Sequence, residues 1–403
     1  MAHRSPLVTT FEREGAVTAS YGPEDGGIDV TQTFGHLELE YAALRNRCVL
    51  LDRPDGAVIR IAGADRMEFL NNMLTQELAG VASGDAVRSF WLSRKGRIVA
   101  DLLLLIRDDH IVAHLDAFMA SAFVDSLGGY VMMEDTTLED VTDHAHRLEL
   151  IGPTAVELLS SLAGDHPTRS GMCIKSEIAG CAVLLDRDDA LGVPAIGLTL
   201  AAQDAVQVAQ ALLAAGSPAG LDRIGQEDGA IADDRSLAAR VRLRLAGWQA
   251  LNIARIEAGL PRFMLDFGPS SLPAETGLLD SRVSFTKGCF LGQEIVARMK
   301  SLGHPKQVVV GLRCESKLND TNGVVQPQTG SVLSPEGELG VDVGAVTSAT
   351  LSPTLGGVPV ALATVKWGYH EPGTRLVLTA EGQRLAAEVQ PGLATAPVIA
   401  ANN

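Results

Sequence analysis

The pattern of this 403-residue sequence changes near Pro305. Upstream, segments with helical spacing, such as 37–47, mix with short apolar strands, such as 98–106. Downstream, helical spacing stops, and short strands such as 308–313 and 358–366 are separated by Gly and Pro, as in a small β-barrel or sandwich. Because the upstream helices and strands do not alternate as strict βαβ units, we predict an α+β fold and not a doubly wound sheet.

This change of pattern predicts two regions. Residues 1–304 are expected to form an α+β region, and residues 305–403 a C-terminal β-barrel domain. An insertion at 217–244 carries five acids and five arginines, a composition typical of a solvated segment, and its second half is expected to be an exposed helix with ion pairs.

Composition excludes several classes of protein. The 33 Lys and Arg against 49 Asp and Glu give a net charge of −16, which argues against non-specific DNA binding. No stretch reaches the roughly 18 consecutive apolar residues of a membrane span, and the N-terminal residues lack the apolar core of a secretory signal. Five cysteines without a CxxC pair fit neither a disulfide framework nor a zinc ribbon. We therefore expect a cytoplasmic protein with no membrane or DNA partner, in which four of the five cysteines are core residues.

One segment, KGCFLGQEIVAR at 287–298, stands out for its chemistry. Two glycines bracket Cys289, so the backbone is free to take a tight conformation there. A helix is expected to follow, which places Cys289 beside a helix N-terminus and two residues from Lys287, both of which favour a thiolate. Such a thiolate suits a nucleophile, a redox switch or a soft-metal ligand. The alternative is a small buried hydrophobe in a turn, and the residues alone do not decide between them.

The segment is similar to the KGCYxGQE signature of the YgfZ family, the folate-binding relatives of the glycine-cleavage T-protein that support iron–sulfur enzymes. Here Phe290 stands where Tyr is usual, so the ring is kept and the hydroxyl is lost. Further segments across the chain resemble the same family, at 40–52, 63–76, 95–101, 254–259, 273–278 and 346–363.

The resemblance implies a three-domain cloverleaf of the glycine-cleavage T-protein type, with tetrahydrofolate or a one-carbon derivative in a central hole. In this fold, residues 1–304 form two interleaved α+β subdomains. Its relatives carry an Asp-Asp pair on a hairpin, which here is Ala100-Asp101, so one carboxylate is missing. Glu257 resembles the acid that reads the pterin ring, by accepting its adjacent N–H donors.

The remaining predicted site residues are cationic or amide side chains. Arg255 and Lys287 are candidates for the glutamate tail of folate, and Gln293 and Arg298 complete the cofactor-binding set. Without the resemblance, Asp101 and Glu257 would be interpreted as charges that pair locally.

Three functions follow as hypotheses. The first is a YgfZ-like protein that binds tetrahydrofolate and assists assembly or repair of iron–sulfur enzymes, with Cys289 as a redox thiol or transient cluster ligand and cluster carriers as partners. The second is a folate-dependent aminomethyl- or methyltransferase of the T-protein type, with Asp101 as its carboxylate. The third is a non-catalytic interaction module, in which the acidic surface and segment 217–244 dock a partner.

Overall fold

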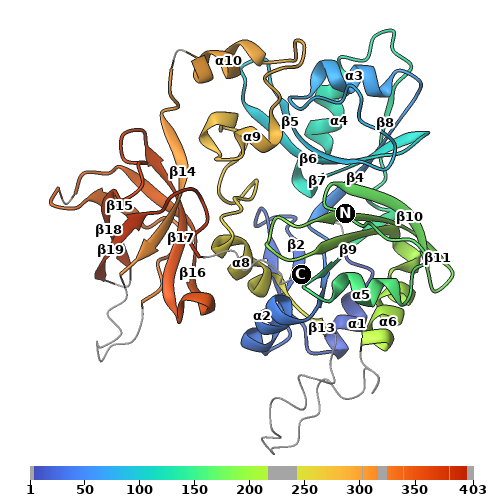
Figure 1. The fold of residues 1–403 in the computed structure, drawn as a ribbon, viewed down its shortest axis with the longest axis horizontal. Coiled ribbons are helices and arrows are strands. Elements are labelled where there is room, and N and C mark those ends of the chain that lie inside the picture. Colours follow the sequence, from blue (N-terminus) through green and yellow to red (C-terminus); the bar gives the residue numbers. More distant parts are fainter. Residues whose placement is uncertain are drawn as a thin grey trace, which may run out of the picture.

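Three lobes make up the molecule, two of mixed helices and strands and one barrel (Figure 1). The computed structural model describes residues 4–216, 243–301, 303–315, 325–338, 340–380 and 382–396. The predicted α+β class with a C-terminal barrel is confirmed. The predicted insertion at 217–244 lies outside the described residues, apart from its last two positions.

The first lobe is built on a five-stranded antiparallel sheet of order β5-β6-β7-β4-β8. Its strands are β4 (Gly56–Ala62), β5 (Ala86–Leu92), β6 (Ile98–Ile106), β7 (His110–Asp116) and β8 (Thr137–Asp140). Helices α3 (Arg66–Met73) and α4 (Ala120–Gly128) pack on one face, where alternate residues of β6 join their apolar side chains. The opposite face carries the charged side chains described below.

The spacing of Met67, Leu70, Met73 and Leu74 predicts a helix through Leu78 with Asp65 as its N-cap, and the first of these two predictions for α3 is wrong. The helix was expected to continue to Leu78, but Leu74 takes an extended backbone conformation and ends it. Asp65 stands at the N-cap position as predicted, but its side chain makes no capping hydrogen bond, and its carboxylate accepts the N–H of Asp135 at 2.8 Å instead. A longer-range contact has therefore replaced the local cap.

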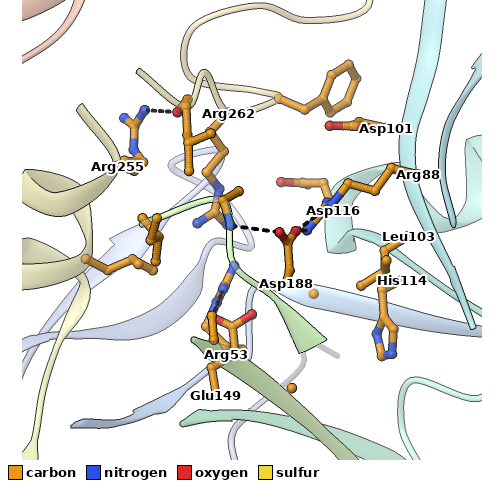
Figure 2. A pocket seen from close by; sticks show the side chains of 18 of the residues that line it. Arg53, Arg88, Asp101, Leu103, His114, Asp116, Glu149, Asp188, Arg255 and Arg262 are labelled. Atoms are coloured by element: carbon orange, nitrogen blue, oxygen red, sulfur yellow. Dashed lines mark hydrogen bonds and ion pairs between the residues drawn. The ribbon is translucent and has the colours of Figure 1, made fainter. Parts of the chain in front are cut away.

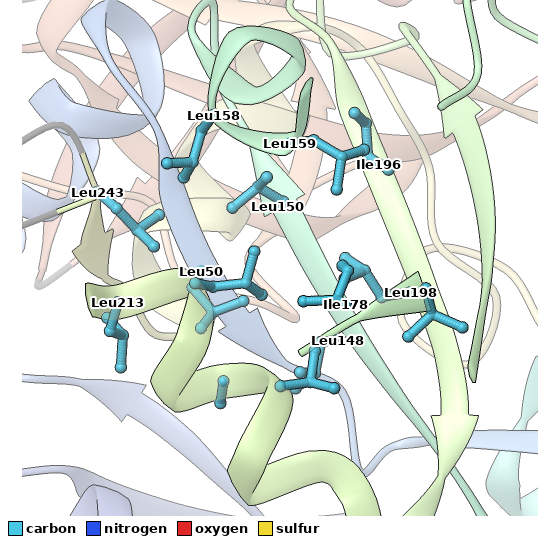
Figure 3. Close-up of a cluster of buried hydrophobic side chains, with 14 of the residues drawn as sticks. Leu50, Leu148, Leu150, Leu158, Leu159, Ile178, Ile196, Leu198, Leu213 and Leu243 are labelled. Carbon is cyan, nitrogen blue, oxygen red and sulfur yellow. The ribbon is translucent and has the colours of Figure 1, made fainter. Parts of the chain in front are cut away.

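The second lobe contains a six-stranded sheet of order β10-β11-β12-β9-β3-β13. Its strands are β3 (Val49–Asp52), β9 (Ala145–Ile151), β10 (Met172–Ile178), β11 (Cys181–Asp188), β12 (Ala195–Ala201) and β13 (Arg244–Leu245). Leu148 and Leu150 of β9 pack on one face with residues of α1 (Val8–Arg13), α5 (Ala155–Ser160) and α6 (Ala205–Gly216) (Figure 3).

Strand β3 is buried on both faces of this sheet. Leu50 joins the core just described, whereas Val49 and Leu51 pack with α2 (Leu37–Asn46) and α8 (Trp248–Glu257) on the other side. Because successive side chains of a strand point to opposite faces, this short apolar run supplies both cores.

The third lobe is a closed barrel of order β14-β17-β16-β15-β18-β19. Its strands are β14 (Gln307–Cys314), β15 (Val332–Pro335), β16 (Gly344–Ser352), β17 (Val358–Lys366), β18 (Arg375–Ala380) and β19 (Gln383–Val389). No α-helix occurs among the described residues after Pro305, as predicted. The barrel docks on α8, where Ile256 packs against Val360 and Leu362.

The remaining elements connect the lobes. They are the hairpin of β1 (Val17–Tyr21) and β2 (Ile28–Thr33), the short helices η1 (Ala117–Met119), η2 (Ala202–Asp204), η4 (Pro273–Glu275), α9 (Leu279–Arg282) and η5 (Pro353–Leu355), and α10 (Gln293–Ser301). Gly292, just before α10, has a φ of +80°, and a Cβ there would lie 2.9 Å from the Ser93 carbonyl. Glycine thus allows α10 to sit against the β5–β6 turn. No helix among the described residues is long and apolar enough to cross a membrane.

Candidate functional site

A cavity of about 520 Å³ lies between the charged faces of the two sheets, closed on a third side by the segment after α8. Its volume falls within the usual range for small-molecule sites, about 300–1,000 Å³. Figure 2 shows its walls. Among the described residues, six arginines and six carboxylates line it: Arg53, Arg88, Arg147, Arg255, Arg262, Arg282, Asp55, Asp101, Asp116, Glu149, Asp186 and Asp188.

Strand alternation explains how charged residues reach the cavity from strands that are otherwise apolar. In β6, Ala100 and Leu102 point into the core of the first lobe, whereas Asp101 and Leu103 line the cavity. Ala100 is fully buried. The two positions of the predicted acid pair therefore lie on opposite faces of the sheet, and only position 101 reaches the cavity.

The Asp101 carboxylate is held by an arginine from α9. Arg282 donates from Nε to its Oδ1 at 2.9 Å, and both side chains are largely buried. Burial lowers the pKa of Arg282, although Asp101 counteracts this effect. The hydrogen bond from Arg282 therefore fixes the orientation of the Asp101 carboxyl group in the cavity.

A second ion pair joins the two sheets across the cavity. Arg88 of β5 donates from Nη2 and Nε to Asp188 Oδ2 of β11 at 2.6 and 2.9 Å (Figure 2). Burial opposes ionisation of Asp188, but Arg88 outweighs it and lowers the pKa of that carboxyl. Deeper in the second sheet, Arg147 makes two parallel bonds to Asp186, at 2.7 and 2.9 Å.

The third wall combines an aromatic ring with arginines. The guanidinium of Arg262 lies 4.4 Å from the centroid of the Trp248 ring and donates to Asp55. Burial, reinforced by the nearby charge of Arg53, lowers the pKa of Arg262 to about 9. Asp55 supplies this buried guanidinium with one negative partner, and an anionic ligand group would add a second.

Asp116 in the cavity wall is hydrogen-bonded to Tyr21 of the β1–β2 hairpin. Tyr21 donates its hydroxyl hydrogen bond to Asp116, which also accepts the N–H of Phe118 at 3.0 Å. Burial raises the pKa of Asp116 despite these two donors. Burial, together with the charge of Asp116, also raises the pKa of Tyr21, so the phenol stays protonated.

Comparisons with known proteins agree with this architecture. A family model described as the GCVT N-terminal domain matches residues 9–231, more than half of the chain. A second, the glycine cleavage T-protein C-terminal barrel domain, matches residues 309–393. The chain belongs to the glycine cleavage T-protein family.

Relatives in this family align along nearly the whole chain. A Bacillus pumilus protein named aminomethyltransferase is 27% identical over 395 residues, covering 96% of this chain and 97% of its own. Another of that name, from Geobacillus kaustophilus, is 28% identical and covers 97% and 98%. The solved glycine cleavage system aminomethyltransferase T from Bartonella henselae has the same fold, with a TM-score of 0.80, 21% identity and coverage of 100% and 99%. The T-protein resemblance is thus confirmed, while the narrower YgfZ assignment stays a prediction.

Among the predicted site residues, only Asp101 and Arg255 line this T-protein cavity. Arg255 is already engaged: its Nη1 donates to Asp266 and its Nη2 to Ser348, both at 2.7 Å. Its guanidinium therefore ties the segment after α8 to the barrel.

Glu257 lies outside the cavity lining, at the joint between α2, α8 and the barrel. Its buried carboxylate accepts hydrogen bonds from Tyr41, Arg45 at 2.7 Å, Ser352 at 2.5 Å and the N–H of Thr354 at 3.3 Å. These donors occupy both oxygens, so Glu257 here serves as an interdomain contact.

No residue of the 287–298 motif is part of the cavity lining. Lys287 is buried and its ammonium donates to the carbonyls of Asn71, Leu74 and Gln76, thereby capping the C-terminal end of α3. Phe290, the ring without the usual hydroxyl, packs in an apolar cluster. Gln293 and Arg298 lie on α10 and are absent from the cavity lining.

Four of the five cysteines are buried, as predicted, and Cys289 is exposed. Among the described residues, no group of three or more His, Cys, Asp or Glu side chains is arranged to hold a metal ion.

Sequence reasoning missed most of the cavity wall. The sequence feature that could have indicated this wall is a set of charges at alternate positions of apolar strands: Arg88, Arg147 with Glu149, and Asp186 with Asp188. Charges spaced by two on one strand face indicate either a solvated surface or a polar cavity, and only the position of the second sheet decides which.

Proposed function

We propose that this chain binds tetrahydrofolate, or a one-carbon derivative, in the cavity between the two sheets and transfers a one-carbon unit to it from an aminomethyl or methylated donor. Membership of the T-protein family and the names of its relatives support this. The observation that carries the proposal is that Asp101 faces the cavity while Ala100 faces the core. The replacement at position 100 therefore removes no carboxylate from the cavity.

The residues present suit tetrahydrofolate by their chemistry. Its pterin ring presents N–H donors, which match carboxylates such as Asp101, and its glutamate tail presents carboxylates, which match guanidinium groups such as Arg262. Tetrahydrofolate is the acceptor in this reaction, and the transferred one-carbon unit becomes attached to an amine nitrogen of tetrahydrofolate.

The side chains of the chain supply orientation and charge. Asp101, fixed in orientation by Arg282, accepts an N–H hydrogen bond from the donor nitrogen and holds the donor at the cavity wall. The Arg88–Asp188 pair fixes the distance between the sheets, so Asp101 and the opposite wall face the ligand at constant separation.

Binding and turnover test this function separately. Wild type is expected to bind tetrahydrofolate in calorimetry and to form methylene- or methyl-tetrahydrofolate with at least one donor of a panel of aminomethyl and methylated amines. Asp101→Asn should lower turnover by about 100-fold, the scale of a lost positioning contact. Asp108→Asn, an exposed control on the adjoining β6–β7 turn, should retain wild-type turnover. Turnover absent across the panel counts against the proposal.

The exposure of Cys289 favours a second candidate, support of iron–sulfur enzymes by a YgfZ-like protein. Its thiol is accessible to a partner and lies in the motif that carries the resemblance. A crossed experiment separates the two functions in cells that lack the native chain. If Cys289→Ala abolishes cluster-enzyme activity and Asp101→Asn does not, the second candidate is supported; the reverse pattern in folate turnover supports the first.

A further inference from the structure

Asp101 and Asp116 form a pair of carboxyl groups on one face of the first sheet. Strands β6 and β7 are antiparallel, with Leu103 opposite His114. Asp101 and Asp116 each lie two residues beyond this last pair, and because side chains two residues apart share a strand face, they lie on the same face as Leu103 and His114. Both line the cavity (Figure 2). Two acids that share a ligand-sized cavity, on adjacent strands, are an arrangement suited to acid–base chemistry.

The surroundings of the two acids differ in charge. Asp101 is paired with Arg282 at 2.9 Å, and Arg88 lies nearby. Asp116 instead contacts the neutral phenol of Tyr21 and a backbone N–H, and no ion pair to it occurs among the described residues. A carboxyl without a paired cation holds a proton more readily than one with such a cation.

Charged and titratable groups approach Asp116 from each neighbouring element. Tyr21 from β1 and Arg53 from the β3–β4 turn act on Asp116 directly. The guanidinium of Arg262, from the segment after α8, lies 5.7 Å from the Tyr21 ring centroid, and His114 lies two residues away on the same strand face. Burial holds the pKa of His114 well below its usual value, so this imidazole is uncharged near neutrality. Burial raises the pKa of Asp116 itself.

We propose that Asp116, held in place by Tyr21, is the carboxylate that moves the proton during one-carbon transfer, while Asp101 orients the donor; this inference rests on the proposed function. In the step considered, a new C–N bond forms to the acceptor nitrogen and the C–N bond to the departing nitrogen breaks. Asp116 accepts the proton displaced from the acceptor nitrogen and delivers it to the departing nitrogen, which leaves as ammonia or a neutral amine. The lone pair of the acceptor nitrogen forms the new C–N bond, and the electron pair of the broken bond leaves with the departing nitrogen, so no oxidant is needed.

Turnover and its pH profile test this role. Asp116→Asn, which keeps the shape, should lower kcat by about 100-fold or more while the dissociation constant for tetrahydrofolate changes less than about threefold. Tyr21→Phe removes a donor that favours ionised Asp116, so the ascending limb of the rate profile should move to higher pH, by about half to one unit. A merely structural role would lower stability without moving this limb.

Calorimetry gives a readout that needs no turnover. A ligand that covers Asp116 removes its water and favours its protonated form, so tetrahydrofolate binding near pH 5 should take up protons, measured from binding enthalpies in buffers of different ionisation enthalpy. This uptake should vanish in Asp116→Asn and persist in Asp101→Asn.

Uptake that persists in Asp116→Asn, or that is absent from wild type, would overturn the assignment, as would full turnover of Asp116→Asn. If wild type binds folate but turns over no donor, the proposed function fails, and the calorimetric result alone decides whether Asp116 is the protonating group.

Discussion

Replacing Glu257 by Gln separates the two roles considered for this residue, pterin recognition and interdomain contact. The substitution keeps the size of the side chain but removes the charge opposite Arg45, whose side chain is only 9% exposed. It also removes acceptor capacity used by Tyr41 and Ser352. Breaking a buried ion pair from one side costs about 3–5 kcal/mol. Because Gln retains one carbonyl acceptor, we expect a loss of about 3 kcal/mol in the free energy of unfolding.

Urea unfolding followed by tryptophan fluorescence measures this loss. Glu294→Gln, an exposed acid on α10, is the matched control and should change the free energy of unfolding by less than about 0.5 kcal/mol. Tetrahydrofolate affinity of folded Glu257→Gln should match wild type, because the residue is absent from the cavity lining. A variant of unchanged stability with tenfold weaker folate binding would refute the reasoning and restore Glu257 as a pterin ligand.

Three further predictions follow from the cavity and its supports. Ala100→Asp restores the acid pair of the motif, but it should destabilise the fold by about 3 kcal/mol or more without raising turnover, because position 100 is buried among apolar side chains; increased turnover would contradict the assigned face. Lys287→Met leaves three carbonyls unpaired and should lower the free energy of unfolding by about 3 kcal/mol, while exposed Lys95→Met changes it little; equal unfolding midpoints would be inconsistent with the cap. The pKa of Asp188 is lowered in the folded state, so its stabilising contribution is present above the unfolded pKa of about 3.9 and disappears as pH falls through the folded value; Arg88→Leu should abolish this contribution, which acid titrations of unfolding will detect.

The difference between predicted and observed site residues follows from sequence distance. Asp101 was found because its hairpin motif is local and strand alternation then determines which face it occupies. Glu257 was also found in a local motif, but its partners Tyr41 and Ser352 lie 216 and 95 residues away. No local pattern indicates that these partners occupy its oxygens.

The cavity wall shows the same limit more strongly. Arg88 and Asp188 are 100 residues apart, and each by itself has the appearance of a solvated strand charge. The positive charge of Lys287 suggests an anion-binding residue. In the structure, however, α3 ends at Met73, and the Leu74 carbonyl beyond that end accepts a hydrogen bond from the Lys287 ammonium. Fold class, barrel and buried cysteines follow from local spacing, whereas the polar contacts depend on how the sheets meet.

A crystal structure of the chain with tetrahydrofolate tests the central claim most directly, that the cavity between the two sheets is the folate site. We predict that the ligand lies between these sheets, with a ligand nitrogen within hydrogen-bond distance of Asp101. Tetrahydrofolate bound beside Glu257 or Cys289, or a cavity left without ligand at saturating concentration, would contradict the account.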